Sequence, residues 1–179
     1  MDPEVEERPT RNTPVLSIVA IVMSVGALLV SVFEVSAIRD EQRVQVWPYL
    51  SLSTNYSGEG FTLEAINKGI GPARVRTLEL TYEGELVEDL DQLILETLGE
   101  EDAFSYELYR ASDLSNSVLS PDEERIVFGV PWEPRTRRLV DIWISRIDLS
   151  ACFCSVYDEC WESRLNAGDP MPVASCKAN

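Results

Sequence analysis

Four cysteines near the C-terminus, Cys152, Cys154, Cys160 and Cys176, are the residues best suited to do chemistry. In an oxidising compartment such thiols form disulfides, whereas in a reducing one they can bind zinc as thiolates. A four-thiolate zinc site usually contains paired Cys-x-x-Cys knuckles, but here two cysteines are spaced Cys-x-Cys. The spacing therefore favours disulfides, with a zinc site as the alternative.

The order of the cysteines suggests which pairs bond. Cys152 and Cys154 are two apart on a predicted strand, so they share a face and are poorly placed to bond to each other. Cys160 follows a short acidic turn, which brings it opposite Cys154 in a hairpin. We predict bonds between Cys154 and Cys160 and between Cys152 and Cys176, and an exchange of partners fits almost as well. Two such bonds would staple the tail, residues 162–179, to the sheet, each contributing about 2 to 4 kcal/mol.

Carboxylates are abundant and stand in two groups. A pair of acids can cleave a glycosidic bond, and a cluster can hold Ca²⁺. The spacing does not match the calcium-loop pattern, and solvated acidic faces are common. We therefore predict no catalytic, cofactor-binding or metal-binding residue, and keep a carboxylate- or cation-dependent hydrolase as the alternative. The groups are Glu83, Glu85, Glu88, Asp89 and Asp91, and Glu96, Glu100, Glu101 and Asp102.

The composition excludes several classes of function. The chain has no histidine, which removes the usual general base, the Ser-His-Asp and Cys-His arrangements, and most catalytic zinc sites. It has 15 basic and 31 acidic residues, a formal net charge of −16, which argues against nucleic acid as a partner. We expect no cofactor, and a partner that is a protein.

An uncharged apolar stretch from Val15 to Phe33 must position everything that follows it. As a helix it is roughly 28 Å long, which matches a hydrocarbon core of roughly 30 Å. A cleavable signal peptide is the rival interpretation, but the apolar run is too long and the segment before it is acidic. We predict a short tail over residues 1–14, a transmembrane signal anchor over 15–38 and a juxtamembrane stalk over 39–45.

Small and hydroxyl residues recur within the anchor at steps of three and four. Helices in lipid associate through such residues, so the pattern indicates a seam for a partner helix or a second copy. The alternative is that each serine hydroxyl bonds to a carbonyl of its own helix. Both interpretations stay open. The seam comprises Ser17, Ala20, Ser24, Ala27 and Ser31.

Beyond the stalk, alternating apolar residues predict about seven short strands with short connections, which favours antiparallel pairing. The expected strands lie near residues 44–53, 61–65, 74–82, 104–108, 126–130, 140–144 and 151–157. Pro48 cannot donate to a ladder, so the first strand is expected at a sheet edge or with a bulge at Pro48. A phase slip near Arg76-Thr77 indicates a bulge in the third strand. One short helix is expected over residues 90–98, with Asp89 as its cap and Gly99 as its end. Arg135, Arg137 and Arg138 are expected on a loop.

A turn from Asn67 to Ala73 separates two of these strands. Gly69 and Gly71 are expected to supply unusual backbone angles, Pro72 fixes the exit, and Asn67 can bond to the turn backbone. This turn resembles one in bacterial immunoglobulin-like surface domains of the CARDB type and in single-pass bacterial envelope proteins. The resemblance implies a hairpin inside a β-sandwich and carries over no binding or catalytic residue.

The sequence thus predicts a mainly β protein: a single transmembrane helix, then an immunoglobulin-like antiparallel β-sandwich over residues 46–161 with one short inserted helix, and a stapled tail. Arginines flank the anchor almost evenly, so the disulfides decide its orientation. We expect a single-pass protein of the bacterial inner membrane, with a cytoplasmic N-terminus and a periplasmic or extracellular domain. The expected function is non-catalytic binding or assembly of proteins in the envelope.

Overall fold

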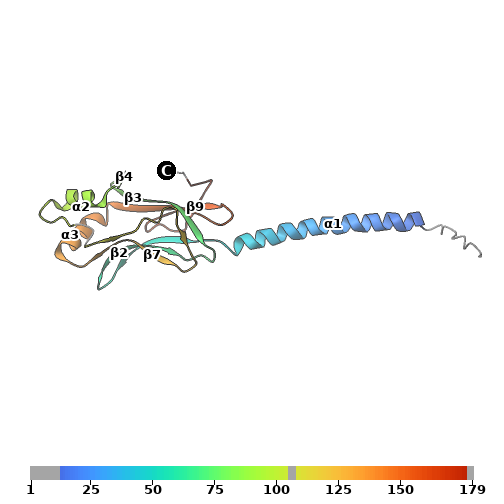
Figure 1. The fold of residues 1–179 in the computed structure, drawn as a ribbon, viewed down its shortest axis with the longest axis horizontal. Coiled ribbons are helices and arrows are strands. Elements are labelled where there is room, and N and C mark those ends of the chain that lie inside the picture. The colour runs from blue at the N-terminus through green and yellow to red at the C-terminus, as the bar shows by residue number, and fades with distance from the viewer. Residues whose placement is uncertain (1–12, 105–107, 177–179) are drawn as a thin grey trace, which may run out of the picture. The chain divides into compact units, whose positions relative to one another are not determined.

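The computed structural model describes residues 13–104 and 108–176. The chain forms two units, residues 1–44 and 45–179. The first unit contains helix α1, Thr13–Val44, which continues through most of the predicted stalk (Figure 1). Its stretch from Val15 to Arg43 is long and apolar enough to cross a membrane. None of the residues in the most apolar part of this stretch is buried. The described residues therefore contain one candidate span, near the N-terminus, as predicted.

In the second unit, the described residues form two antiparallel sheets and two short helices (Figure 1). One sheet has the order β1-β2-β7-β5, and the other has β10-β9-β8-β3-β4, with β6 also paired to β3. The predicted mainly β, sandwich-like unit is therefore confirmed. The strands of the first sheet are β1 (Leu50–Tyr56), β2 (Gly60–Asn67), β7 (Glu124–Pro131) and β5 (Arg110–Ala111). Those of the second are β10 (Met171–Val173), β9 (Cys160–Arg164), β8 (Ile147–Cys154), β3 (Ala73–Tyr82), β4 (Glu85–Leu86) and β6 (Val118–Leu119).

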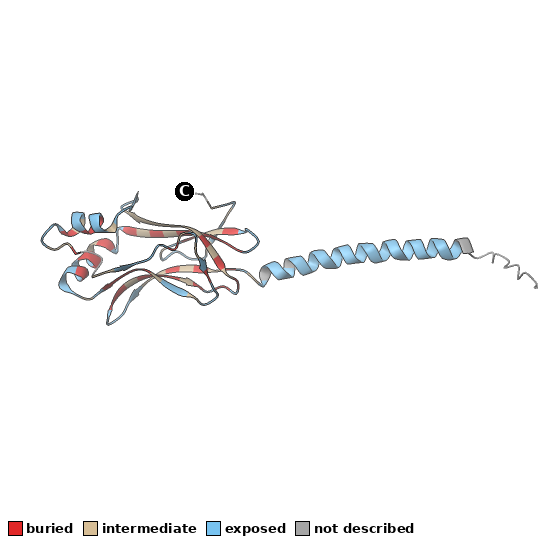
Figure 2. Ribbon diagram, in the orientation of Figure 1, coloured by how far each residue is buried: buried red, intermediate tan, exposed pale blue. Residues whose placement is uncertain are grey.

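Residues from the facing sides of both sheets form one core, shown as the buried stretches in Figure 2. On β2 the buried side chains include Phe61 and Leu63, and on β8 they include Leu149 and Phe153. This alternation follows from the two-residue period of a strand. Two helices, α2 (Leu90–Leu98) and α3 (Pro134–Trp143), add apolar side chains to the same core.

Several local predictions are confirmed. Helix α2 begins where the side chain of Asp89 accepts hydrogen bonds from the amides of Asp91 and Gln92, and it ends at Gly99, whose φ is +80°. Strand β1 lies at an edge of its sheet. The register between β3 and β8 shifts between Val75 and Thr77, where the bulge was expected.

The predicted strand at residues 140–144 is wrong, because this segment belongs to α3. Pro134 occupies the first turn, and the side chains of Glu133 and Thr136 form a capping box. The residues that α3 buries are Thr136, Leu139, Val140 and Trp143, a helical spacing. The domain therefore has a second helix, and Arg135, Arg137 and Arg138 lie on it rather than on a loop.

Other boundaries also differ from the prediction. The first strand begins at Leu50 rather than Val44. Phe104 and Leu108 are not in a strand, Tyr106 lies outside the described residues, and the nearby strand is β5. The region predicted as a tail after residue 161 contains most of β9 and all of β10, so the sheet extends to Val173.

Candidate functional site

The cysteines lie on the outer face of the six-stranded sheet. Strand β8 buries Phe153 on its core side, so Cys152 and Cys154 point to the opposite side. Strand β9 places Cys160 directly opposite Cys154. After β10 the chain returns to bring Cys176 to the same face. The structure bonds Cys152 to Cys176 and Cys154 to Cys160, the pairs expected from the sequence.

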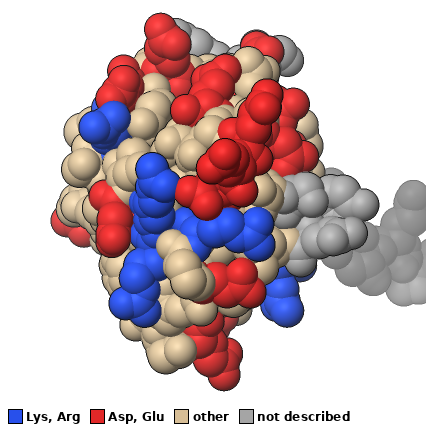
Figure 3. All heavy atoms as spheres, turned by 90° about the vertical axis from the view of Figure 1, so that its left-hand side faces the viewer, with Lys and Arg blue, Asp and Glu red and all other residues tan. Residues whose placement is uncertain are grey.

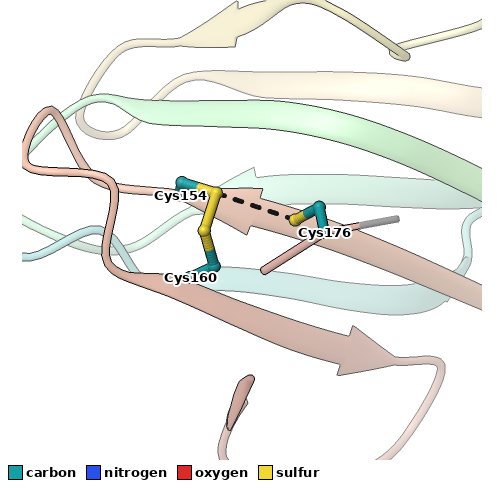
Figure 4. Close-up of side chains that lie close together, drawn as sticks. All are labelled: Cys154, Cys160 and Cys176. Carbon is teal, nitrogen blue, oxygen red and sulfur yellow. Dashed lines mark hydrogen bonds between the residues drawn. A yellow bond between two sulfur atoms is a disulfide. The ribbon is translucent and has the colours of Figure 1, made fainter. Parts of the chain in front are cut away.

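The two disulfides lie against each other. The Sγ atom of Cys154 is 3.7 Å from that of Cys176, as the dashed line in Figure 4 marks. The sulfurs of Cys154, Cys160 and Cys176 all lie within 4.8 Å of one another. Such a set would suit a soft metal ion if it were reduced. No cysteine of the described residues is free, so the thiolates needed for zinc are held in bonds.

A cavity of about 570 Å³ opens beside these sulfurs. Its lining includes Cys154, Cys160 and Cys176 together with Arg76 and Asp158. Asp158, at the tip of the β8-β9 hairpin, accepts from the guanidinium of Arg74 at 2.9 Å and lies 3.8 Å from that of Arg76. The sulfur cluster therefore has a cavity and charged groups at its side.

Asn67 is the centre of the turn that ends β2, and its side chain is fully buried. Its carbonyl oxygen accepts from the amide N–H groups of Tyr49 (3.2 Å) and Gly69 (3.1 Å). Its amide nitrogen donates to the backbone carbonyls of Gly71 (2.8 Å), Leu119 (3.0 Å) and Ser120 (3.2 Å). One side chain thus joins three segments that are distant in sequence, which is a structural role.

The expected hairpin at this turn is wrong, and Gly69 and Gly71 do not adopt left-handed backbone angles. Strand β2 belongs to one sheet and β3 to the other, so the turn carries the chain between the layers. Neither Gly69 nor Gly71 has a positive φ. They are required because a Cβ on Gly71 would lie 1.9 Å from the carbonyl oxygen of Val46, and one on Gly69 would lie 2.3 Å from the amide nitrogen of Tyr49. Pro72 is half-buried at the exit of the turn.

The predicted seam lies on α1, and its five side chains, from Ser17 to Ser31, are exposed within that unit. The Ser24 hydroxyl donates to the carbonyl of Ala20 at 2.8 Å, and the Ser31 hydroxyl donates to that of Ala27 at 3.0 Å. Both serine hydroxyls therefore bond to carbonyls of their own helix, as the alternative to a packing seam predicts. They leave the small side chains in place, so association through this face stays a prediction.

An aromatic stack on the other sheet was not anticipated from the sequence. Tyr56 is 54% exposed and stacks on Trp132, with ring centroids 6.2 Å apart and an interplanar angle of 21°. The guanidinium carbon of Arg137 lies 5.2 Å from the centre of the Trp132 ring, and the indole N–H donates to the carbonyl of Ser57. We call Tyr56, Trp132 and Arg137 the aromatic platform. Tyr56 and Trp132 are 76 positions apart by number, so only the fold brings them together.

Basic side chains gather at the end of this unit where α2 and α3 lie, among many acidic ones (Figure 3). The arginines of α3 are exposed and each has a local partner. Arg138 pairs with Asp102 at 2.7 Å, and Arg135 lies 3.9 Å from Glu133. This end therefore presents guanidinium groups on an otherwise acidic chain.

The acidic groups do not converge on a buried pair. Most of these carboxylates are exposed, and Asp102 is half-buried and paired with Arg138. Glu64 is the one buried acid of the described residues, at 6% exposure, and its carboxylate accepts from the side chains of Asn55 (3.1 Å) and Thr62. Asp91 accepts from the hydroxyl of Tyr109 at 3.0 Å; burial and this bond raise the pKa of Tyr109 to about 12.

Among the described residues, the fold therefore brings together one chemically distinctive group, the cysteine cluster, and one surface of the type found in protein interfaces, the aromatic platform. Comparisons with family models, with curated proteins and with solved structures find no match to this chain.

Proposed function

We propose that this protein is a non-catalytic component of the bacterial envelope, anchored in the inner membrane by α1, whose β-domain binds another protein or helps to hold a larger assembly. The observation that carries the proposal is the pair of disulfides in a domain that follows an apolar helix. Disulfides form and persist in oxidising compartments. The domain then lies outside the cytoplasm and the N-terminus lies inside.

The aromatic platform supports a binding role. Tyrosine, tryptophan and arginine are enriched in protein interfaces and at their energetic hot spots. Here the Trp132 ring is held in place by its bond to Ser57 and by the flanking Tyr56 and Arg137 side chains. A preorganised aromatic surface loses little conformational freedom when a partner docks on it.

The partner surface is expected to carry apolar side chains together with carboxylates. The apolar groups would cover Tyr56, and the carboxylates would pair with the α3 arginines, which are 44% exposed at Arg135 and 59% exposed at Arg138. A different protein fits better than a second copy, because two chains of net charge −16 repel each other.

A carboxylate- or cation-dependent hydrolase is the alternative function. It needs two or more buried acids that face one cavity. One cavity is lined by Glu85, Glu88, Asp89 and Glu96, but all four are exposed. Support would come from a second buried carboxylate near Glu64. Among the described residues there is none. Binding is therefore the better supported function.

Site-specific photo-crosslinking in native membranes tests the proposal. We would place a photoreactive phenylalanine analogue at Tyr56, and as the matched control at Val156, which is 45% exposed and lies on the β8-β9 hairpin. A crosslinked protein at position 56 and none at 156 is the expected result. Crosslinking at neither position, or equally at both, would contradict the proposal that the aromatic platform is the interface.

Alkylation of intact cells tests the compartment separately. We expect no reactive thiol on the full chain until a reductant is added, because all four cysteines are bonded. Four labelled cysteines without reductant would place the domain in a reducing compartment and overturn the proposed orientation.

A further inference from the structure

The four cysteine sulfurs form a continuous line through two bonds and one contact. Cys152 is bonded to Cys176, Cys176 lies 3.7 Å from Cys154, and Cys154 is bonded to Cys160 (Figure 4). A thiol–disulfide exchange begins when a thiolate attacks one sulfur of a disulfide. Cys176 therefore lies in contact with the sulfur that it would attack, and once its own bond is reduced its side chain must turn into line with the Cys154–Cys160 bond.

The two bonds differ in how far solvent can reach them. Cys154 and Cys160 are 3% and 8% exposed, whereas Cys152 and Cys176 are only half-buried. An outside thiol can thus reach the outer bond, Cys152–Cys176, more readily than the inner one. The inner bond is reached from Cys176 and from the cavity of about 570 Å³ that Cys154, Cys160 and Cys176 line.

We propose that the cluster is a thiol–disulfide relay that passes two electrons from an external dithiol to the inner disulfide. The dithiol attacks Cys152, forms a mixed disulfide with it and releases Cys176 as a thiolate. Cys176 then attacks Cys154, which forms the Cys154–Cys176 bond and releases Cys160. The second thiol of the dithiol then attacks the first sulfur of the dithiol, which is bonded to Cys152 in the mixed disulfide. This forms the disulfide of the oxidised dithiol and releases Cys152.

The relay is balanced in atoms and electrons. One S–S bond of the domain is lost overall, and one is formed in the dithiol, which is oxidised by two electrons. The two protons of the dithiol end on Cys152 and Cys160. The released Cys160 thiol can donate a hydrogen bond to the backbone carbonyl oxygen of Asp158, which lies 3.5 Å from its sulfur.

The order of attack follows from position along the strand. Cys152 and Cys154 are two apart on the same face of β8, an arrangement that does not present their side chains to each other at bonding distance. Cys176 comes from the returning tail and meets Cys154 directly. Only Cys176 of the outer pair is therefore expected to continue the exchange.

Two single variants of the full chain in detergent micelles test this inference. Cys152→Ser and Cys176→Ser each remove the outer bond and each leave one thiol beside an intact inner bond. Both are incubated at about pH 8.5, where roughly half of an ordinary thiol is ionised, then acid-quenched, alkylated and mapped by mass spectrometry.

In Cys152→Ser we expect alkylated Cys160 and a Cys154–Cys176 peptide, with labelling of Cys160 about tenfold or more above that in Cys176→Ser. The label in Cys176→Ser should stay on Cys152. If Cys152→Ser carries its label on Cys176 alone and keeps the Cys154–Cys160 bond, the relay is overturned.

The unaltered chain gives an independent measurement if either variant misfolds. After a single equivalent of dithiothreitol and an acid quench, we expect the half-reduced protein to contain the Cys154–Cys176 bond with Cys152 and Cys160 alkylated. A half-reduced protein that retains Cys154–Cys160, with Cys152 and Cys176 alkylated, contradicts the relay. Neither result depends on the proposed protein partner.

Discussion

The segment before β1 and the segment after β10 are both fixed to the sandwich, but by different chemistry. Residues 46–49 are held by the turn at Asn67, through hydrogen bonds to Tyr49 and through the close approach of Gly71 to Val46. The returning tail is held by the bond between Cys176 and Cys152. One attachment depends on backbone shape, and the other on the oxidation state of two sulfurs.

This difference indicates what each attachment tolerates. A buried hydrogen-bonded turn loses stability whenever a side chain changes its size or its donors, whatever the compartment. A disulfide tolerates many neighbouring changes but is lost in a reducing environment. The domain therefore combines a sequence-sensitive attachment at one end with a redox-sensitive attachment at the other.

Replacing Asn67 with alanine should have the largest effect on the turn. The amides of Tyr49 and Gly69 would lose their acceptor in a buried site, and each unsatisfied group costs about 1 to 3 kcal/mol, so we expect a loss of about 4 kcal/mol. Urea unfolding monitored by tryptophan fluorescence measures it. Lys68→Ala, at an exposed position in the same turn, is the control and should cost less than about 1 kcal/mol. Equal losses in both variants would mean that Asn67 is not the centre of the turn.

Removing the outer disulfide should have the next largest effect. For the double variant Cys152→Ala, Cys176→Ala, with a sequence separation of 24, chain entropy predicts a loss of roughly 3.5 kcal/mol. The two attachments share no residue, so the cost of Asn67→Ala should be the same with and without this bond, within about 0.5 kcal/mol. If the cost of Asn67→Ala changes by much more than this when the outer disulfide is removed, the two attachments do not act independently.

Alanine at Gly71 tests the close approach alone. The new Cβ would lie 1.9 Å from the Val46 carbonyl oxygen, so the backbone must shift, and overpacking of this kind costs about 1 to 3 kcal/mol. Gly58→Ala is the matched control, because its Cβ would meet no atom within 4 Å. Its unfolding free energy should change by less than about 0.5 kcal/mol. If the two variants are equally stable, the backbone at Val46 and Gly71 can move apart without loss of unfolding free energy, and the close approach does not stabilise the turn.

The sequence predicted the sheets well because alternation of apolar residues is a local signal. It failed at residues 140–144, where Val140, Ile142 and Ile144 alternate although the segment is helical. The competing signal was also local: Pro134 in the first turn and the capping residues Glu133 and Thr136. A helix and a strand can both bury Val140, so the alternation of apolar residues does not distinguish them. The capping residues and Pro134 predict the helix.

Features that depend on contacts between distant segments could not be predicted in the same way. The glycines of the turn were recognised, but their reason is the approach of Val46 rather than an unusual φ. The predicted hairpin favoured the disulfide pairs that the structure has, but the sequence left an exchange of partners open. The contact between Cys154 and Cys176 depends on the path of the returning tail. The aromatic platform joins β1 with the segment before α3, and no local pattern marks it.

The smallest expected effect is a dependence of stability on acidic pH that arises from Glu123, a residue that supports the turn at Asn67. Glu123 accepts from the backbone amide of Ser120 at 2.8 Å and from Arg125 at 2.7 Å, and these bonds hold its pKa below the ordinary value. Its backbone carbonyl accepts from the amide of Asn67, so Glu123 supports the same turn.

Because the folded pKa of Glu123 is the lower one, the unfolded chain binds more protons in the window between the two values. The stabilisation is thus complete above the unfolded pKa of about 4.3 and is lost as the pH falls through the folded value. Melting temperatures measured from about pH 6 downward should fall less steeply for Glu123→Gln than for the unaltered chain. The variant that lacks Cys152 and Cys176 should keep the full slope, because a disulfide does not titrate. A reduced slope in that variant would show that the two attachments are coupled through the sheet.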